Sequence, residues 1–332
     1  MLGVLMLIVQ VFLGGVTRLT GSGLSITEWK AIMGFLPPMN EQDWHSAFEK
    51  YKQFDQYKLV NTAMTLADFK NIFLWEYVHR LWARFMALCA FLPMLYFAWK
   101  KILKPEDVLK IVFIIMLGAL EGLVGWIMVA SGLEKNKVLV DPVKLMMHLL
   151  IASLIISLTF RFAIEYIYPK NEKPGLSSQR KFLSAFIGII FIQIGLGALV
   201  AGSKAALNAP TWPLMNDSYF PPHWGFLHPW PDYIHENNVF LQFLHRNMAY
   251  FIAVFALFLF VKLKSSISKE FQFTRKLFLF AVLFQVTIGI LTLLFTQGKV
   301  PVFWGELHQL GAYFVLLTAI AAHYFSKYRT AA

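Results

Sequence analysis

Eight apolar runs dominate this chain of 332 residues, and most are long enough to cross the roughly 30 Å hydrocarbon layer of a membrane. Because lipid offers no hydrogen-bond partner to backbone amides, each spanning run must be helical. Hydrophobic residues make up 58% of the chain and charged residues 15%, which excludes a soluble globule. We predict an all-α integral membrane protein, with eight transmembrane helices forming two pseudo-symmetric four-helix bundles. The runs lie at about 2–16, 76–99, 111–131, 145–166, 182–202, 242–261, 277–296 and 306–326.

Basic residues are distributed unevenly between the connections that separate these runs. The connections 100–110, 161–181 and 262–276, with the tail after Ser326, carry 16 Lys and Arg in about 56 residues, whereas the opposite connections carry 11 in about 124. Because basic residues are retained on the cytoplasmic side, both termini are expected there and the two long loops outside. The net charge of +11 mainly reflects this asymmetry, and no long basic run indicates nucleic-acid binding.

The first run is short for a spanning helix. Only about 15 residues precede Thr17 and Arg18, whereas a span needs roughly 20. We therefore expect the natural first helix to begin upstream of Met1. A cleaved signal peptide is the alternative, although neither a basic n-region nor a small-residue cleavage site is visible.

Four histidines occur near the starts of four of the predicted helices. Corresponding members are 166 residues apart (His79 and His245) and 160 residues apart (His148 and His308). An ionisable side chain at membrane depth is costly, so four in register indicate a function rather than ordinary helix packing. With the topology above, each histidine is expected within about two turns of the outer end of its helix.

The sequence also repeats in two halves, 1–166 and 182–326, which the polar linker 167–181 is expected to separate. Each odd-numbered helix carries Gln or Glu followed four residues later by Gly, and each even-numbered helix carries a histidine. Packing of small residues explains the glycines but not the amides or histidines, so we infer a duplication with one site in each half. The odd-helix elements are Gln10-x3-Gly14, Glu121-x3-Gly125, Gln193-x3-Gly197 and Gln285-x3-Gly289, and the halves share Trp29 with Trp212 and Pro37-Pro38 with Pro221-Pro222.

Two facing imidazoles in a helical bundle are typical of b-type haem binding. Zinc fits less well, because two histidines per site without cysteine or paired carboxylates are too few ligands for a closed site. The only cysteine, Cys89, is expected to be a small core residue, and without a CxxCH motif haem would be bound non-covalently. Candidate partners for haem propionates, with interfacial snorkelling as an equal alternative, are Arg18, Arg80, Arg84 and Arg246. The remaining histidines, expected in solvated or interfacial positions, are His45, His223, His228, His235 and His323.

The two halves differ chemically beside the histidines. Glu76 precedes His79 by three residues on one helix face, whereas the neutral Gln242 stands at the corresponding place before His245. This asymmetry predicts proton-coupled chemistry in the N-terminal half and an electron-transferring cofactor in the C-terminal half. A salt bridge from Glu76 to Arg80, or a hydrogen bond to His79, is the alternative explanation.

Two further acids lie close to the histidines in the sequence. Glu121 occupies the position that is Gln in the three other odd-helix elements. Glu306 lies two residues before His308, on another helix face, and is expected to be an interfacial acid.

Four separated stretches resemble the haem A synthase family, in order and over nearly the whole chain. They are Gly14–Pro38 (GGVTRLTGSGLSITEWKAIMGFLPP), Glu76–Arg84 (EYVHRLWAR), Gly125–Leu133 (GWIMVASGL) and Leu244–Tyr250 (LHRNMAY). Some members of that family carry a cysteine pair in an external loop, which this chain lacks. It is therefore similar to the cysteine-free mitochondrial and alphaproteobacterial type.

The resemblance implies oxidation of the C8 methyl group of haem O to the formyl group of haem A, for cytochrome oxidase. It implies that His245 and His308, beside Gln242 and Arg246, hold a permanent haem b. His79 and His148 would serve the substrate haem, with Glu76 required for turnover. Two successive hydroxylations and loss of water would complete the reaction, with electrons leaving through haem b.

The resemblance also implies a location and partners. The location is the inner membrane of a bacterium or mitochondrion, with both haem sites toward the outer side. The partners are the upstream haem O synthase, an electron acceptor of unspecified class and the lipid membrane, with a homo-oligomer as an option.

Two other functions fit parts of the pattern. A diheme b-type electron-transfer cytochrome would also have two bis-histidine sites, but would place its haems at opposite depths, whereas all four histidines are predicted on one side. A repeat-built transporter would need broken helices and polar groups at the midplane.

Overall fold

The computed structural model describes residues 1–28, 36–168, 177–221, 237–263 and 268–326. Within these ranges the chain is helical, and the only extended pairing is an isolated bridge between Met215 and Ser218. Seven helices are long and apolar enough to cross a membrane, which confirms the all-α membrane class. They are α1 (Leu2–Leu19), α4 (Leu66–Trp99), α5 (Pro105–Gly132), α6 (Pro142–Ile167), α7 (Ser177–Gly202), α9 (Asn238–Lys262) and α10 (Lys269–Leu294).

The eighth predicted span is present as a helix, α11 (Val302–Phe325), but it is not among those seven. Polar residues such as Glu306, His308 and Gln309 in its first turns lower its hydropathy. Eight spans and a pseudo-symmetric pair of bundles therefore stay predictions.

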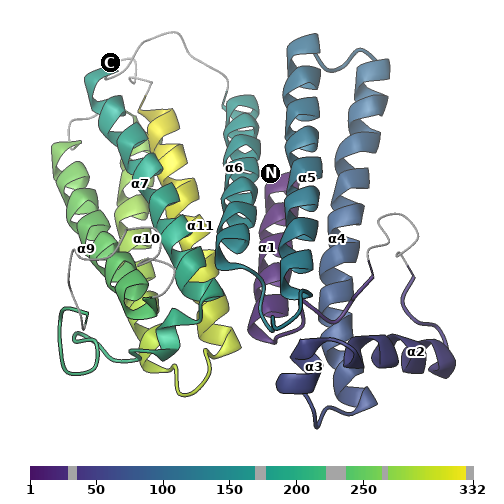
Figure 1. The fold of residues 1–332 in the computed structure, drawn as a ribbon. Coiled ribbons are helices and arrows are strands. Elements are labelled where there is room, and N and C mark those ends of the chain that lie inside the picture. Colours follow the sequence, from purple (N-terminus) through teal and green to yellow (C-terminus); the bar gives the residue numbers. More distant parts are fainter. Residues whose placement is uncertain (29–35, 169–176, 222–236, 264–267, 327–332) are drawn as a thin grey trace. The chain divides into compact units, whose positions relative to one another are not determined.

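Packing divides the chain into two compact units, Leu2–Ile155 and Ile156–Ala332, with Met1 grouped with the second. We call them the N-terminal and C-terminal units (Figure 1). The division passes through the middle of α6 and not through the linker 167–181, of which 169–176 lie outside the described residues. The division into functional halves at that linker stays a prediction.

In the N-terminal unit, α1 packs against α4 and α4 against α5. The indole N–H of Trp82 in α4 donates to the carbonyl of Met6 in α1 over 2.9 Å. The start of α6 is fixed by Asp141, whose carboxylate accepts the amides of Val143 and Lys144, two of the N–H groups that a helix start leaves unpaired.

The long loop of this unit contains two short helices, α2 (Glu41–Lys52) and α3 (Asp55–Leu59), that pack on the first turns of α4. Phe48 and Tyr51 form a buried aromatic cluster with Phe69 and Phe73 of α4. A capping box between Thr65 and Asp68 starts α4, ten residues before the predicted position (76 minus 66).

The longer α4 corrects one expectation about depth. His79 lies 13 residues into α4 (79 minus 66), nearly four turns, and not within two turns of the helix start. The reason is that the first turns of α4 carry the aromatic cluster. The other three histidines lie 6 or 7 residues into their helices, as predicted.

In the C-terminal unit, α7, α9, α10 and α11 pack side by side (Figure 1). The core is aromatic, with Phe186 of α7 edge-on to Phe278 of α10 at 4.9 Å between ring centroids. The segment after α7 contains the short 3-10 helix η1 (Ala205–Leu207). Ala209 and Met215 beyond it are buried against Phe240 and Phe243 at the start of α9.

Two placements differ from expectation. Cys89 is exposed, because it lies on the face of α4 that no other part of the described chain covers, and is not a core residue. Glu306 is only 4% exposed, so it is buried in the unit and not an interfacial acid. Trp29, Pro222 and the histidines at 223, 228 and 235 lie outside the described residues.

Candidate functional site

Each of the four histidines lies against the glycine of the preceding odd helix. Added Cβ atoms at these glycines would approach the imidazole Cε1 closer than real Cβ contacts allow, or nearly so, and a side chain there would push the ring away. The sequence element x3-Gly therefore forms a seat for a ring. The Cβ to Cε1 distances are 2.9 Å for Gly14 and His79, 2.8 Å for Gly125 and His148, 3.1 Å for Gly197 and His245, and 2.8 Å for Gly289 and His308.

The Gln or Glu of each element also contacts the same histidine, one helical turn away from the glycine. The contacts join Gln10 Nε2 to His79 Nε2 at 3.5 Å, Glu121 Oε1 to His148 Nδ1 at 3.1 Å, Gln193 Nε2 to the His245 carbonyl at 3.0 Å, and Gln285 Nε2 to His308 Nδ1 at 3.1 Å and to its carbonyl at 2.9 Å. The sequence pattern of amide, glycine and histidine thus corresponds to one local arrangement that occurs four times.

In the C-terminal unit, His245 and His308 face each other. Their ring centroids are 6.2 Å apart and their planes are 82° apart. A metal–imidazole bond is about 2.0–2.1 Å, and a ring nitrogen lies about 1.1 Å from its centroid for ring bonds of roughly 1.3–1.4 Å. Two imidazoles on opposite sides of one metal ion therefore have centroids about 6.3 Å apart. The spacing fits a bis-histidine iron, and these residues fit a haem.

In the N-terminal unit, His79 and His148 lie near enough for the charge of one to act on the other. Glu121 is the acid nearest to this pair, with its carboxylate 3.1 Å from His148. Among the described residues, no group of three or more His, Cys, Asp or Glu side chains is placed to hold a metal ion. Each pair therefore supplies two ligands, as haem iron needs from a protein.

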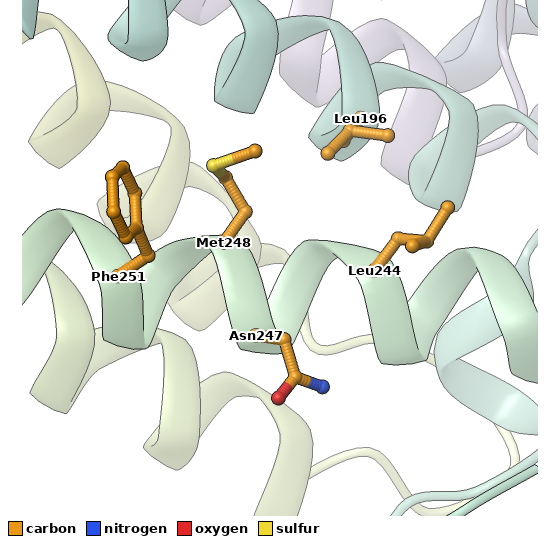
Figure 2. Close-up of a pocket in the computed structure, with 5 residues that line it drawn as sticks. All are labelled: Leu196, Leu244, Asn247, Met248 and Phe251. Atoms are coloured by element: carbon orange, nitrogen blue, oxygen red, sulfur yellow. The ribbon is translucent and has the colours of Figure 1, made fainter.

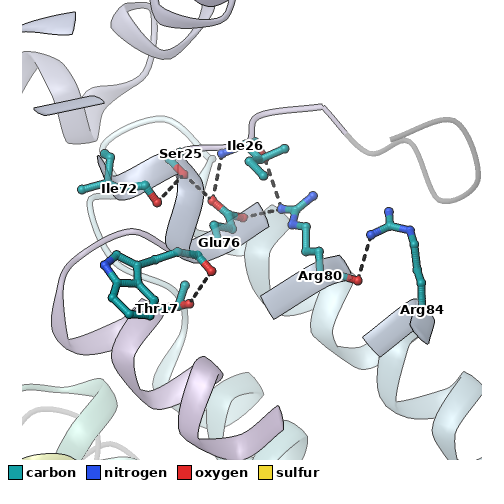
Figure 3. A network of polar contacts seen from close by, with 8 residues as sticks. Thr17, Ser25, Ile26, Ile72, Glu76, Arg80 and Arg84 are labelled. Carbon is teal, nitrogen blue, oxygen red and sulfur yellow. Dashed lines mark hydrogen bonds and ion pairs between the residues drawn. The ribbon is translucent and has the colours of Figure 1, made fainter. Parts of the chain in front are cut away.

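Glu76 points away from these rings, toward the segment that follows α1 (Figure 3). Its carboxylate is 2% exposed, accepts hydrogen bonds from Ser25 Oγ at 2.7 Å and Ile26 N at 2.9 Å, and is ion-paired with Arg80. Arg80 also donates to the Ile26 carbonyl over 3.2 Å. The salt bridge weighed as an alternative from the sequence is thus present, and Glu76 and Arg80 together bind this segment to α4.

The C-terminal unit contains a matching arrangement with neutral chemistry. Gln242 Nε2 donates to the Ala209 carbonyl over 3.1 Å, and Arg246 donates to the same carbonyl over 2.8 Å. Adding the offset between Gln10 and Gln193 (183) to Ile26 gives position 209, so the two bound segments correspond in the repeat. Glu76 and Gln242 therefore differ in which backbone group they bind: the acid accepts an N–H and the amide donates to a C=O.

Ser25, Ile26 and Ala209 are site residues that the sequence analysis missed. The offset of 183 pairs Ile26 with Ala209, but neither residue type suggests a site, since both act through the backbone. Of the candidate propionate partners, Arg80 is engaged by Glu76, Arg84 donates to the Arg80 carbonyl over 2.9 Å, and Arg246 is engaged by Ala209.

An open apolar groove of about 560 Å³ lies beside the C-terminal pair, between α7 and α9 (Figure 2). Leu196 and Leu244, which directly precede Gly197 and His245, line it together with Met248. Its one polar lining residue, Asn247, accepts from Tyr219 and donates to the Phe243 carbonyl, so the groove is suited to an apolar group. The remaining described histidines are away from both pairs: His45 is exposed on α2, and His323 contacts Ser184 at 3.1 Å.

Comparison with known proteins agrees with these features along the chain. Residues 1–320 match the cytochrome oxidase assembly protein family COX15-CtaA. The chain belongs to this family. Among its members, the haem A synthase of Nitrosomonas eutropha is 40% identical over 317 residues, covering 94% of this chain and 88% of the relative. The haem A synthases of Nitrosospira multiformis and Bradyrhizobium sp. are 38% and 39% identical, each over 94% of this chain and over 87% and 85% of their own lengths. All four histidines and their glycines fall within the part of the chain that matches the COX15-CtaA family.

Proposed function

We propose that this protein is a haem A synthase, which oxidises the C8 methyl group of haem O to the formyl group of haem A for cytochrome oxidase. The observation that carries the proposal is the fourfold histidine seat, with one pair at the spacing of a bis-imidazole iron. The names of relatives about 40% identical over nearly the whole chain give the reaction.

His245 and His308 are the proposed ligands of a permanent haem b, whose chemistry would be to accept electrons one at a time and pass them on. Gln285 and Gly289 hold the His308 ring, and Gly197 holds the His245 ring. Gln242 and Arg246 act one shell further out, by binding the segment around Ala209 to α9. The groove beside Leu244 gives this site an apolar boundary.

His79 and His148 are the proposed ligands for the iron of the substrate haem O. Conversion of a methyl to a formyl group breaks two C–H bonds and adds one oxygen, so electrons and protons must both leave the site. Electrons would go to haem b and then to an external acceptor. Protons need a nearby base, and Glu76 is the proposed acidic residue required for turnover, three residues from His79 on the same helix.

The contacts of Glu76 refine this role. Its carboxylate is held by Ser25, Ile26 and Arg80, so it also fixes the segment after α1 beside the start of the histidine-bearing part of α4. A base that is held in place needs no reorganisation when a proton arrives. The C-terminal unit has the amide Gln242 there, which supports assigning proton-coupled chemistry to the N-terminal pair.

Location and partners follow from this reaction. The protein would lie in a bacterial inner membrane or the mitochondrial inner membrane, with its histidines toward the outer side. It would receive haem O from a haem O synthase. The diheme electron-transfer cytochrome considered from the sequence is not favoured by the names of the relatives.

The proposal is tested by expressing the protein with a supply of haem O and extracting the porphyrins. Recovery of haem A together with a hydroxymethyl intermediate supports it. Recovery of haem b alone, with haem O unconverted, contradicts it and returns the diheme cytochrome.

The division of labour is tested by Glu76→Gln. This isosteric change removes the base but leaves the haem b ligands untouched, so we expect no haem A and an unchanged haem b spectrum. Gln242→Glu is the matched control in the other unit, and it should leave conversion largely intact. Normal turnover of the Glu76→Gln protein would show that the carboxylate only binds the segment after α1.

A further inference from the structure

Glu121 is the residue that departs from the fourfold repeat of the histidine seats. The three other elements place a glutamine amide beside the histidine, whereas this one places a carboxylate. Its Oε1 lies 3.1 Å from His148 Nδ1, and its side chain is only 15% exposed. Its second oxygen is buried and has no hydrogen-bond partner among the described residues, so the contact that the structure gives this acid is the imidazole.

A carboxylate and an amide constrain an imidazole differently. A glutamine can present either its oxygen or its NH2 to a ring nitrogen, so Gln285 is compatible with either tautomer of His308. A carboxylate only accepts. At 3.1 Å from Nδ1, Glu121 favours the tautomer with its proton on Nδ1, which leaves the lone pair of Nε2 for a metal.

The ring of His148 is held on a second side as well. A Cβ at Gly125 would lie 2.8 Å from its Cε1 and 3.3 Å from its Nδ1, so the backbone of α5 passes directly beneath the ring. In the structure the Nδ1–H direction is not yet aligned with the carboxylate, and the contact is one of ion-pair distance. Contacts of this kind commonly tighten when a site is filled.

We propose that Glu121 is a positioning residue that fixes the tautomer of His148 and makes it a more electron-donating ligand than its three counterparts. This rests on the proposed function, in which His148 binds the iron of haem O. A carboxylate that accepts the second N–H of a ligating histidine raises the basicity of that ligand, and removing such partners typically costs 10–100-fold in metal affinity. It also stabilises the oxidised iron over the reduced iron, which lowers the midpoint potential.

The test is Glu121→Gln, which restores the amide of the other three elements with almost no change in volume. Purified protein containing haem b is titrated with haem O, and the dissociation constant and midpoint potential of the added haem are measured. We expect binding at least about tenfold weaker and a higher midpoint potential. The haem b spectrum and content should stay unchanged, which also reports that the variant is folded.

Gln285→Glu is the reciprocal variant in the C-terminal unit and gives a second reading if the first variant is poorly folded. It should lower the midpoint potential of haem b. Equal haem O affinity and equal potential in the Glu121→Gln and parent proteins would overturn the inference while leaving the proposed function standing. If the parent protein binds no haem O at all, the proposed function fails, and this inference fails with it.

Discussion

The glycine seats give the sharpest quantitative prediction, and Gly289→Ala is the most informative variant. The added Cβ would lie 2.8 Å from Cε1 of His308, whereas ordinary van der Waals contact begins at 3.4 Å. The ring or the backbone must therefore move by at least 0.6 Å (3.4 minus 2.8). Metal–ligand distances are conserved within about 0.2 Å, so a shift of this size disrupts ligation.

The energetic cost follows from packing. Overpacking by one methyl group in a close-packed region typically costs about 1–3 kcal/mol. If the strain falls on the bound ring, haem b affinity drops by roughly 5- to 140-fold, at about 1.4 kcal/mol per factor of ten. The substitution should otherwise favour the helix by up to about 1 kcal/mol, because Ala is a better helix former than Gly.

The assay is the haem b content of the purified protein, from its reduced-minus-oxidised spectrum and a pyridine haemochrome. Gly188→Ala in α7 is the matched control, because a Cβ there meets nothing within 4 Å. We expect substoichiometric haem b in the Gly289→Ala protein and full occupancy in the Gly188→Ala protein. Full occupancy with a parental spectrum in both would refute the reasoning.

Two further predictions concern contacts that hold the units together internally. Arg80→Ala leaves the buried carboxylate of Glu76 without its ion pair and should cost about 3–5 kcal/mol; Arg246→Ala removes donors from a neutral partner and should cost about 1–3 kcal/mol, so the thermal unfolding temperature in detergent should fall further for the first variant. Equal losses would show that Glu76 is not charged in the folded protein. Trp82→Phe removes the hydrogen bond to the Met6 carbonyl and should cost only about 0.6 kcal/mol, the average for side-chain hydrogen bonds between membrane helices; an unfolding temperature many degrees lower would contradict this.

The parts of the site that could be predicted from the sequence are those in which a side chain has a distinctive chemistry. Histidines at membrane depth are rare, and the glycines at a fixed spacing pointed to the same four places at which the structure seats the rings. Membrane class and helix positions followed from long apolar runs, because hydropathy is a property summed over many residues.

The missed features depend on the backbone or on packing outside the apolar runs. The ten-residue extension of α4 is stabilised by aromatic contacts of Phe69 and Phe73 with α2, and the apolar run alone does not reveal it. The partners of Glu76 include the backbone N–H of Ile26, a group that every residue but proline has. Cys89 was expected in the core because hydropathy does not distinguish a face that meets lipid from one that meets protein.

The central claim is that the two histidine pairs do different work, and one matched pair of variants tests it directly. His308→Ala and His148→Ala are each supplied with haem O, and the haem b content and the haem A formed are measured in the same preparation. The account predicts that His308→Ala loses haem b, whereas His148→Ala keeps haem b and forms no haem A. Loss of haem b from the His148→Ala protein, or normal haem A formation by it, would contradict the account.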